Sequence, residues 1–592
     1  VSPSKQIKFQ QCFGIYQCAR LEVPLDWSNK SDPRTAAVAV IKRPAKVPVT
    51  DPRYGGPILI NPGGPGGSGV SLALKQSEHL QNIVDSPHAP CSTASNNSDL
   101  YFDIIGFDPR GVNNTTPAFT CFPDDASQQN FVIAAQAAGI ITDDAAFRTT
   151  YNRVMSVSGT CSKVMAERGR FMSTPFVVED MMEITERLAE WRENKAKSLL
   201  KKANQRKSAG ILHRTKWRKG EEPVQYIGFS YGTVLGSTLA SMHPRRMKRV
   251  VIDGVVDVDD YYAGTWLSNL QDTDKIMTRF FELCHEAGPH KCAIYSATGP
   301  PGSRAILEQV LASLKWSPLA VMAHGGYAPD LITFSDLMDY IREAVYKPHD
   351  FFKPLAQAIF DVSVGNGSIL AEHKQSGRKT FCPTSECRND GPWSDACHTP
   401  GAGDFKGEVS AAIHCTDAPD FTGKGEEFHK EKWETLRRQS SALGNWWAEI
   451  TMYCSNWWIR STWRFEGEDK QKVGGNTSHP ILLVSNTYDP VTPLRNAHKI
   501  SGRFNGSTVL EQHTDGHCAI PDASLCIAKH VREYFQTGKL PEPGTVCKHD
   551  FGHFDDREEP NTMALNAEDA ALLWTTYRLR SVPRERAYTL GI

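Results

Sequence analysis

A serine between two glycines stands near the middle of the chain, in the segment 228–232, Gly-Phe-Ser-Tyr-Gly. An apolar run at 224–227 precedes it, and a segment with helix-like composition at 233–242 follows it. A strand that turns this tightly into a helix strains the serine backbone and exposes the hydroxyl, and the helix N-terminus behind it favours developing negative charge. The segment therefore predicts that Ser230 is a nucleophile, with an ordinary strand-to-helix turn as the alternative.

A nucleophilic serine needs a base that takes its proton and a carboxylate that orients the base. In a strand-turn-helix arrangement the three groups follow one another along the chain as serine, acid and histidine. Asp489 stands just after the apolar run 480–485, and His517 follows 28 residues later, in a loop after another strand-like segment. An open parallel sheet displays its functional groups at such strand ends, so we predict Asp489 as the acid and His517 as the base.

Two other histidines, and another role for the aspartate, compete with this assignment. His513 lacks the preceding glycine that permits a tight loop, and His243 lies at the end of the helix that follows the serine. Asp489 precedes a proline, and an Asp-Pro pair is also typical of a simple turn. The order along the chain favours Asp489 with His517.

A glycine-rich loop, 61–69 with the sequence NPGGPGGSG, follows the apolar run 57–60. So bare a backbone can turn its N–H groups toward a bound oxygen atom. The loop has neither the spacing nor the lysine of a phosphate-binding loop. We therefore predict an oxyanion hole formed by the N–H of Gly64 and the N–H of Tyr231.

The elements that must position these groups alternate along the chain. Helices are predicted at 178–191 and 233–242. Strands are predicted at 36–42, 57–61, 101–107, 224–227, 249–256, 480–485 and 509–513. This alternation predicts an α/β fold with a mostly parallel sheet covered by helices on both faces.

The alternation breaks in the middle of the chain, which defines the predicted domains. Residues 259–475 hold helix-like pieces, a Cys/Gly/Pro-rich stretch and several tryptophans, and are predicted to form a large, mainly helical inserted cap. The core then comprises 1–258, with a basic surface insertion at 193–220, and 476–592. Nucleic-acid binding would need a wider basic face with interleaved aromatic residues, so the basic insertion is interpreted as a solvated surface.

Composition excludes several classes of protein. The chain has 592 residues, 40% hydrophobic and 22% charged, with a formal net charge of −1. This is the balance of a globular protein with no bias toward nucleic acid or an anionic membrane, and neither partner is expected. No apolar run reaches the roughly 18 residues that suggest a membrane span. Because the chain starts at Val1, we expect that a signal peptide has been removed.

Cysteine usage indicates an oxidising compartment. Among the 15 cysteines, three pairs are closely spaced: Cys12 with Cys18, Cys284 with Cys292, and Cys518 with Cys526. Such spacing suits small disulfide-closed loops, and the odd total leaves at least one thiol outside them. Asn-x-Ser/Thr triplets begin at Asn29, Asn96, Asn113, Asn114, Asn366, Asn476 and Asn505. Together these features predict secretion or delivery to a vacuole-like lumen.

A metal site is a weaker interpretation of one cysteine cluster. Cys382, Cys387, Cys397 and His398 offer four ligand types at short spacing. In an oxidising compartment disulfides explain these cysteines better. No metal and no cofactor is therefore expected.

Seven strings resemble the tripeptidyl-aminopeptidase-like branch of the α/β-hydrolase superfamily, which is related to proline iminopeptidases. They are NPGGPGGSG (61–69), GFDPRGV (106–112), GFSYGTVLG (228–236), VVIDGVVD (250–257), AAIHCTDAPD (411–420), YDPVTP (488–493) and GHC (516–518). The resemblance runs in family order from about residue 20 to 550. It implies Ser230 as nucleophile, Asp489 as orienting acid, His517 as base, a cap from Val256 to about Gly475, and exopeptidase activity on N-terminal peptides.

The resemblance also implies details outside these three residues. A disulfide beside the histidine would join Cys518 to Cys526, and another would join Cys415 to Cys454. An acidic cap residue would hold the substrate's free amine, and Glu449, Glu426 and Glu427 all remain candidates. Val112 to Thr116, and the long stretches 193–220 and 382–397, depart from the family pattern and leave the substrate open.

The sequence thus predicts a secreted serine exopeptidase that acts on peptides as a monomer. An esterase, a lactonase or another secondary-metabolite hydrolase with the same three residues, acting on a small ester, is the alternative. A binding protein on a hydrolase scaffold is disfavoured, because nucleophile, acid, base and oxyanion loop are all present.

Overall fold

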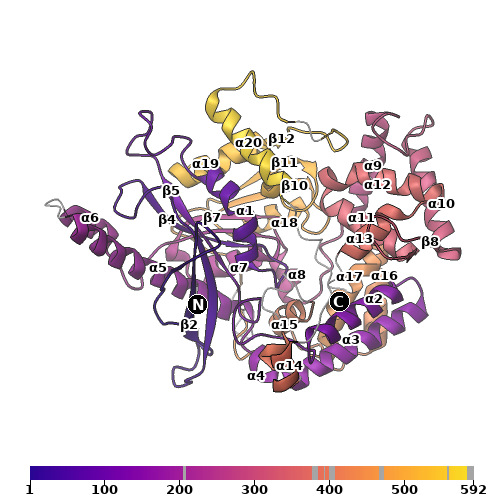
Figure 1. The fold of residues 1–592 in the computed structure, drawn as a ribbon, viewed down its shortest axis with the longest axis horizontal. Helices are drawn as coiled ribbons and strands as arrows, with labels where there is room; N and C mark the ends of the chain where they lie inside the picture. The colour runs from indigo at the N-terminus through magenta and orange to yellow at the C-terminus, as the bar shows by residue number, and fades with distance from the viewer. Residues whose placement is uncertain are drawn as a thin grey trace.

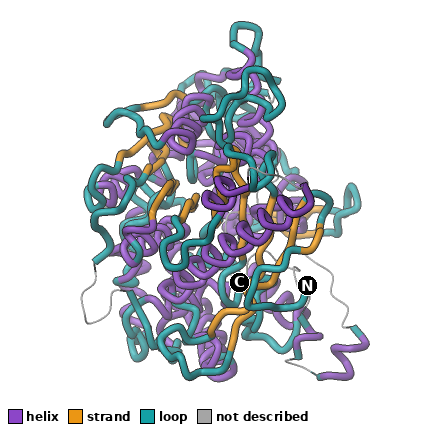
Figure 2. The backbone as a smooth tube through the Cα atoms, turned by 90° about the vertical axis from the view of Figure 1, so that its left-hand side faces the viewer, coloured by secondary structure: helices purple, strands orange, loops and turns teal. Residues whose placement is uncertain are grey.

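The computed structural model places the chain in an α/β architecture with a large helical layer over one end of the sheet (Figure 1). It describes all residues except 204–207, 377–383, 392–393, 399–406, 466–471, 557–558 and 583–592. Figure 2 shows the strands inside a shell of helices and loops.

A ten-stranded sheet forms the centre, in the order β1-β2-β3-β5-β4-β6-β7-β10-β11-β12. Its first four strands pair antiparallel, and every pairing from β5 to β12 is parallel. The strands are β1 (Gln10–Cys12), β2 (Tyr16–Pro24), β3 (Thr35–Arg43), β4 (Tyr54–Asn61), β5 (Tyr101–Phe107), β6 (Val224–Phe229), β7 (Met247–Asp253), β10 (Leu482–Tyr488), β11 (Thr508–Asp515) and β12 (Val546–Lys548). The predicted mostly parallel sheet is confirmed, and each predicted strand overlaps an observed one.

The central strands are buried on both faces, which explains their continuous apolar runs. Ile58 and Ile60 of β4 belong to one hydrophobic cluster, and Leu59 between them belongs to the other. Successive side chains of a strand point to opposite faces, so the two clusters mark the two sides of the sheet.

Helices α1, α19 and α20 cover the side of the sheet that carries Ile58 and Ile60, and α5 and α7 cover the side that carries Leu59. These core helices are α1 (Gly69–Val84), α5 (Thr174–Ala203), α6 (Ser208–Thr215), α7 (Tyr231–Met242), α18 (Leu494–Ser501), α19 (Leu525–Thr537) and α20 (Ala567–Ser581), with short 3₁₀ turns η1 (Pro244–Arg246) and η4 (Ile520–Asp522). Among the described residues, no helix combines the length and the apolar character that crossing a bilayer requires.

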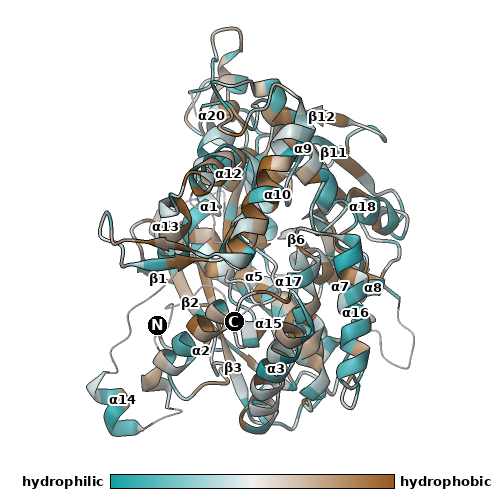
Figure 3. Ribbon diagram, turned by 90° about the vertical axis from the view of Figure 1, so that its right-hand side faces the viewer, coloured by the Kyte–Doolittle hydropathy of each residue, from teal (hydrophilic) through white to brown (hydrophobic). Residues whose placement is uncertain are grey.

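The segment predicted as a cap forms most of the helical layer at the right of Figure 1. It contains α8 (Val258–Tyr262), α9 (Thr273–Ala287), α10 (Pro300–Trp316), β8 (Leu319–Val321), β9 (Asp330–Ile332), α11 (Phe334–Tyr346), α12 (Pro348–Ser363), α13 (Ser368–Ser376), α14 (Ser385–Asp390), η2 (Asp395–Cys397), α15 (Gly407–Asp417), α16 (Glu426–Gln439), α17 (Gly444–Met452) and η3 (Tyr453–Asn456). Figure 3 shows α16 with mostly hydrophilic colours on the face turned to the viewer, as expected for an outer helix.

Three helices from before the serine belong to this layer as well. They are α2 (Asp125–Ala138), α3 (Asp144–Val164) and α4 (Ala166–Gly169), between β5 and α5. Helix α3 packs against α16, α17 and η3, and a disulfide between Cys121 and Cys161 closes the segment. The helical layer is therefore built from two separate stretches of chain, 124–169 and 258–456, whereas the predicted cap takes in only the second.

The basic insertion is a continuation of α5 followed by α6 (Figure 1). Lys197 pairs with Glu193 one turn away, and Arg192 pairs with Glu222. The predicted basic residues Arg206 and Lys207 lie outside the described residues. Arg192 and Lys197 are therefore each paired with a carboxylate.

Six disulfides are present in the described part of the chain: Cys12–Cys18, Cys121–Cys161, Cys284–Cys292, Cys387–Cys397, Cys415–Cys454 and Cys526–Cys547. The disulfide interpretation of Cys387 and Cys397 is confirmed, and Cys382 lies outside the described residues. The pairing of Cys518 with Cys526 is wrong. The Cys518 sulfur is buried 3.5 Å from the carbonyl oxygen of Asp253, while Cys526 lies in the first turn of α19 and bonds to Cys547 on β12.

Candidate active site

Ser230 is the single residue between β6 and α7, at the turn from the strand into the helix. Its φ of 54° lies in the left-handed region, which is uncommon for a residue with a side chain. The Ser230 N–H donates to the Asp253 carbonyl oxygen at 3.0 Å, so the end of the neighbouring strand β7 holds the turn. A strained serine at a strand-to-helix turn is what the glycine-serine-glycine pattern predicts.

His517 lies in the loop after β11 and contacts Asp489 in the loop after β10. Its Nδ1 is 3.0 Å from Asp489 Oδ2 and 3.1 Å from Oδ1, and the Thr492 hydroxyl lies 3.2 Å from the same nitrogen. Burial by itself raises the pKa of Asp489, but the His517 ring and the N–H groups of Cys518 and Val491 outweigh it and hold this pKa below its ordinary value. Asp489 is therefore an anion placed to orient the imidazole.

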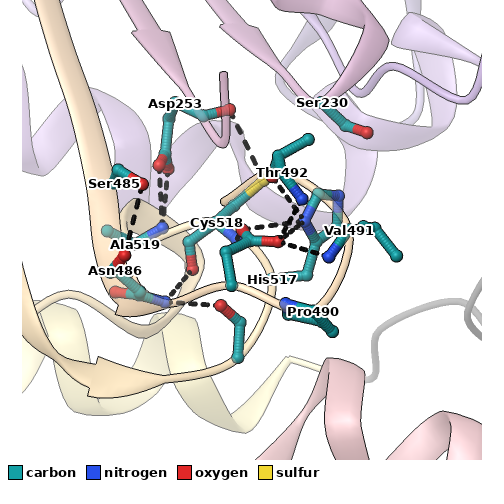
Figure 4. A network of polar contacts seen from close by, with 12 residues as sticks. Ser230, Asp253, Ser485, Asn486, Pro490, Val491, Thr492, His517, Cys518 and Ala519 are labelled. Atoms are coloured by element: carbon teal, nitrogen blue, oxygen red, sulfur yellow. Dashed lines mark hydrogen bonds and ion pairs between the residues drawn. The ribbon is translucent and has the colours of Figure 1, made fainter. Parts of the chain in front are cut away.

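Asp253, at the end of β7, ties the histidine loop to the serine turn (Figure 4). Its carboxylate accepts hydrogen bonds from the N–H of Ala519 at 2.8 Å and of Ile520 at 2.7 Å, while its carbonyl accepts from Ser230. Burial raises the pKa of Asp253 to about 7, and the two N–H groups oppose that rise. The sequence reasoning missed this residue, because VVIDGVVD entered only as part of the family resemblance.

Asn486 holds the same loop from β10. Its Nδ2 donates to the carbonyl oxygens of Gly516 at 2.8 Å and Cys518 at 3.0 Å (Figure 4). The His517 N–H donates to the carbonyl oxygen of Tyr346, at the end of α11. The backbone on either side of the imidazole is thus fixed by buried groups. The ring orientation is set before a substrate arrives, which lowers the cost of reaching the reactive geometry.

Ser230 and His517 line one pocket together with Gly64, Tyr231 and Thr492. Both residues are described, and no hydrogen bond joins the Ser230 hydroxyl to the imidazole in this structure. Such pairs are often longer in a free enzyme and shorten when a substrate binds. The structure therefore brings the five predicted site residues close together, without a hydrogen bond between the Ser230 hydroxyl and the imidazole.

The glycine loop approaches the serine turn closely at Gly63. An added Cβ on Gly63, whose φ is +91°, would overlap the carbonyl oxygen of Phe229 and lie 2.9 Å from both the Cβ of Ser230 and the nitrogen of Tyr231. Within the described residues, neither the Gly64 N–H nor the Tyr231 N–H donates to a protein acceptor. Two N–H groups without a protein acceptor among the described residues, close to the Ser230 hydroxyl, match the arrangement predicted for an oxyanion hole.

Replacing Gly63 by alanine tests this close approach. The methyl group forces the loop away from the turn and displaces the Gly64 N–H, so we expect kcat to fall about 10²–10³-fold with little change in KM. Steady-state hydrolysis of a p-nitroanilide measures the effect. Gly210→Ala is the control, because its Cβ would meet nothing within 4 Å. An unchanged kcat in Gly63→Ala would contradict the assignment.

A buried polar network lies behind Tyr231. The Tyr231 hydroxyl contacts the Thr174 hydroxyl at 2.6 Å, and the Asp417 carboxylate accepts from Thr174 Oγ1 at 2.6 Å and from the Tyr261 hydroxyl at 2.9 Å. Burial raises the pKa of Asp417 to about 6, although these hydrogen bonds oppose it. The network joins α5, α7, α8 and α15, and so couples the core to the helical layer beside the serine.

Asp417→Asn should change how stability depends on pH. The ordinary pKa of 3.8 rises to about 6 in the folded protein, so the folded state holds this proton more tightly than the unfolded chain. The stabilisation from Asp417 is therefore fully present below the unfolded pKa and is lost as pH rises through the folded one. This loss amounts to about 3 kcal/mol in the free energy of unfolding, and it is absent from the asparagine variant because asparagine does not titrate.

We expect the thermal midpoint of Asp417→Asn, relative to that of the unsubstituted protein, to increase between about pH 4 and pH 7. Differential scanning fluorimetry across that range measures the difference. A difference that stays constant with pH would show that Asp417 does not titrate in this window.

The competing residues lie elsewhere. His513 is exposed on β11 with its Nδ1 3.2 Å from the Thr487 hydroxyl, and His243 ends α7 with its Nε2 2.8 Å from Glu179. Neither belongs to the pocket of Ser230. The structure thus separates both from the predicted base.

None of the three candidate amine-binding acids lines this pocket. Glu449 is buried and pairs with Arg153 at 3.1 Å, and Glu426 pairs with Arg148 at 2.9 Å. Glu427 lies in the first turn of α16, beside Glu426. An amine bound by Glu449 would have to displace an arginine partner.

Comparison with known proteins agrees with this arrangement. The family model for the alpha/beta hydrolase fold matches residues 56–287, and the model for TAP-like proteins matches residues 440–547. The chain is 22% identical to "Serine protease Hip1" of Mycobacterium tuberculosis over 535 residues, 90% of this chain and 87% of that protein. It is 22% identical to "Tripeptidyl aminopeptidase" of Streptomyces lividans over 549 residues, 90% of this chain and 83% of that protein. It is 23% identical to "Putative hydrolase YuaR" of Escherichia coli over 526 residues, 87% and 84% of the two chains.

The sheet order and the matched model define the class of fold: the chain has the α/β-hydrolase fold. More particularly, it is similar to the TAP-like proteins, so the resemblance drawn from the sequence motifs is confirmed. The prediction of a hydrolytic enzyme agrees with relatives named as a serine protease and an aminopeptidase.

Proposed function

We propose that this chain is a secreted serine exopeptidase that cleaves peptides near a free N-terminus through an acyl-enzyme. The observation that carries the proposal is the pairing of His517 Nδ1 with Asp489 at 3.0 Å, in the same pocket as the strained Ser230. Nucleophile, base and acid on three separate loops are the equipment for acyl transfer.

In the proposed mechanism Ser230 attacks the carbonyl carbon while His517 Nε2 takes the hydroxyl proton. Asp489 holds the Nδ1–H of the imidazole and stabilises the imidazolium that forms. The N–H groups of Tyr231 and Gly64 bind the oxyanion. His517 then gives the proton to the leaving amine, and water, activated by the same imidazole, releases the acyl group.

Cleavage near a chain end is supported by the cover over the pocket. The walls include Trp266, Trp446 and Trp447 from the helical layer as well as Ser230 from the core. A pocket closed in this way accepts the end of a peptide more readily than the middle of a long chain. The names of the relatives, tripeptidyl aminopeptidase among them, point in the same direction.

Secretion is supported by the six disulfides of the described residues. Disulfides persist in oxidising compartments and are rare in the cytosol. The relatives named serine protease and tripeptidyl aminopeptidase each match 90% of this chain.

A labelling and substrate-comparison experiment tests the function. We expect a fluorophosphonate probe to modify Ser230, as located by peptide mass spectrometry. We also expect a peptide p-nitroanilide with a free amino terminus to be hydrolysed faster than its N-acetylated form. An aryl ester of the same acyl group serves as a third substrate.

Each result separates the candidates. Equal rates on the free and acetylated peptides would argue against an aminopeptidase. Hydrolysis of the ester alone would favour the esterase or lactonase alternative. Absence of labelling at Ser230 would overturn the serine mechanism and restore the binding-protein hypothesis.

A further inference from the structure

The pocket beside Ser230 is aromatic on the side of the helical layer. Trp266, Trp446 and Trp447 line it together with Tyr261 and Tyr346. Among the described lining residues there is no Asp, Glu, Lys or Arg. A wall of this kind favours uncharged, apolar groups, because a charged group would lose its hydration without gaining a partner.

The aromatic residues divide into two groups around the site. Tyr346 packs edge-on against His517, with ring centroids 5.3 Å apart. The second group is a row of rings that runs from Tyr231 through Tyr261 and Trp266 to Trp447, with successive centroids 5.5, 5.7 and 5.8 Å apart. The pocket therefore has one aromatic wall near the imidazole and one near the oxyanion donors.

The chemistry assigns each wall to one part of the substrate. His517 gives its proton to the leaving group, so the leaving group lies toward His517 and Tyr346. The acyl part stays bonded to Ser230 and extends away from the imidazole, along the row that contains Trp266 and Trp447. This row therefore contacts the residue whose carbonyl is attacked.

Trp266 has an unusual backbone conformation that hydrogen bonds to Asp260 hold in place. Its φ of 54° is an outlier for so bulky a residue. Asp260 enforces the conformation, because its carboxylate accepts from the N–H of Leu267 at 3.1 Å and of Ser268 at 2.8 Å. Backbone strain that surrounding hydrogen bonds hold in place, here half-buried ones, is found most often at sites that contact ligands.

Two carboxylates beside the aromatic row, those of Asp260 and Asp417, already have hydrogen-bond partners. Asp260 is engaged by the turn at 265–268, and Asp417 accepts hydrogen bonds from Thr174 and Tyr261. Burial also raises the pKa of Asp417 to about 6, so its charge is costly even without a substrate. Neither carboxylate is available to a cation in the pocket.

We propose that the row of Tyr261, Trp266 and Trp447 binds an uncharged, apolar side chain on the acyl side of the cleaved bond and excludes a cationic one. This inference rests on the proposed acyl-enzyme function of Ser230. The substrate class is thus a peptide with an aliphatic or aromatic residue at the cleaved carbonyl. Its terminal ammonium group lies beyond these walls, further along the acyl part.

Two matched substrates test the proposal on the intact protein. Ala-Ala-norleucine p-nitroanilide and Ala-Ala-lysine p-nitroanilide differ by the terminal ammonium on an otherwise linear side chain. We expect kcat/KM to favour norleucine by at least about 100-fold, because the lysine charge enters the pocket unpaired. Equal rates, or a preference for lysine, would overturn the inference.

A pair of variants locates the discrimination. Trp447→Ala should lower kcat/KM for the norleucine substrate about 10–200-fold, with little change for Ala-Ala-Ala p-nitroanilide, because the small side chain does not reach the indole. Trp458→Ala is the control, since Trp458 is 65% exposed and lies outside the pocket. Titration of Ser230 with the fluorophosphonate probe corrects each rate for the folded, active fraction.

The two levels of the proposal fail differently. No labelling of Ser230 and no turnover of any substrate would overturn the proposed function and this inference together. Two results would overturn only the inference. One is labelling of Ser230 together with hydrolysis rates that do not depend on the side chain at the cleaved carbonyl. The other is an equal loss of kcat/KM on the norleucine and alanine substrates in Trp447→Ala.

Discussion

Ser230→Ala should abolish hydrolysis while the fold survives. Loss of the nucleophile of a serine triad typically lowers kcat about 10⁶-fold, equivalent to about 8 kcal/mol of transition-state stabilisation. Alanine keeps the Cβ that packs near Gly63 and the N–H that donates to Asp253, so the turn itself is retained. The φ of 54° suits alanine no worse than serine.

The measurement compares p-nitroanilide hydrolysis, probe labelling and thermal midpoint for the two proteins. Ser313→Ala on the exposed face of α10 is the control for handling and purity. We expect the control to match the unsubstituted protein in all three readouts. A Ser230→Ala enzyme that retained more than a few per cent of activity would rule out this serine as nucleophile.

The parts of the site that the sequence predicted share one property: each is local. The turn at Ser230 needs only a strand, two glycines and a helix, all within the continuous stretch 224–242. Asp489 and His517 each follow a strand directly, and a parallel sheet brings such ends to one edge. Burial on both faces of β4 and β6 made their apolar runs continuous, which is the pattern that identifies interior strands.

The parts that the sequence did not predict depend on contacts between distant segments. Asp253 meets Ala519 across more than 260 residues, and no spacing rule links an aspartate in a strand to backbone N–H groups of a later loop. Cys526 is a shorter-range case: it bonds to Cys547, 21 residues away, because α19 packs against β12. Nearness in sequence favoured Cys518, but the tight loop turns that side chain under β7 instead.

The helical layer over the sheet was also only partly predicted, because one of its two stretches is recognised only by its packing. A break in the strand-helix alternation identified 259–475, because that stretch is long and compositionally distinct. The shorter stretch with α2 and α3 lies between β5 and α5, where a connecting helix is ordinary in an α/β fold. Only its packing against α16 and α17 reveals that it belongs to the cover.

Asp489→Asn should lower kcat about 10⁴-fold with the fold intact. Oδ1 of Asp489 accepts from the N–H groups of Val491 at 3.0 Å and Thr492 at 2.7 Å, so the asparagine oxygen takes this place. The amide nitrogen then takes the place of Oδ2, 3.0 Å from His517 Nδ1, and the hydrogen bond that Oδ2 accepts from the Cys518 N–H is lost. Its N–H donates to Nδ1 and moves the ring proton to Nε2, where the imidazole can no longer accept the serine proton.

The expected signature is a large fall in kcat with a small change in KM, since the substrate-binding walls are untouched. Asp420→Asn is the matched control, because its carboxylate is 58% exposed and pairs only with Arg460 among the cations of the described residues. Asp253→Asn gives the decisive contrast, since Asp253 lies in the same cluster and its carboxylate holds Ala519 and Ile520. If Asp489→Asn stayed within about tenfold of the unsubstituted enzyme while Asp253→Asn lost about 10⁴-fold, the orienting acid would be Asp253 at the end of β7.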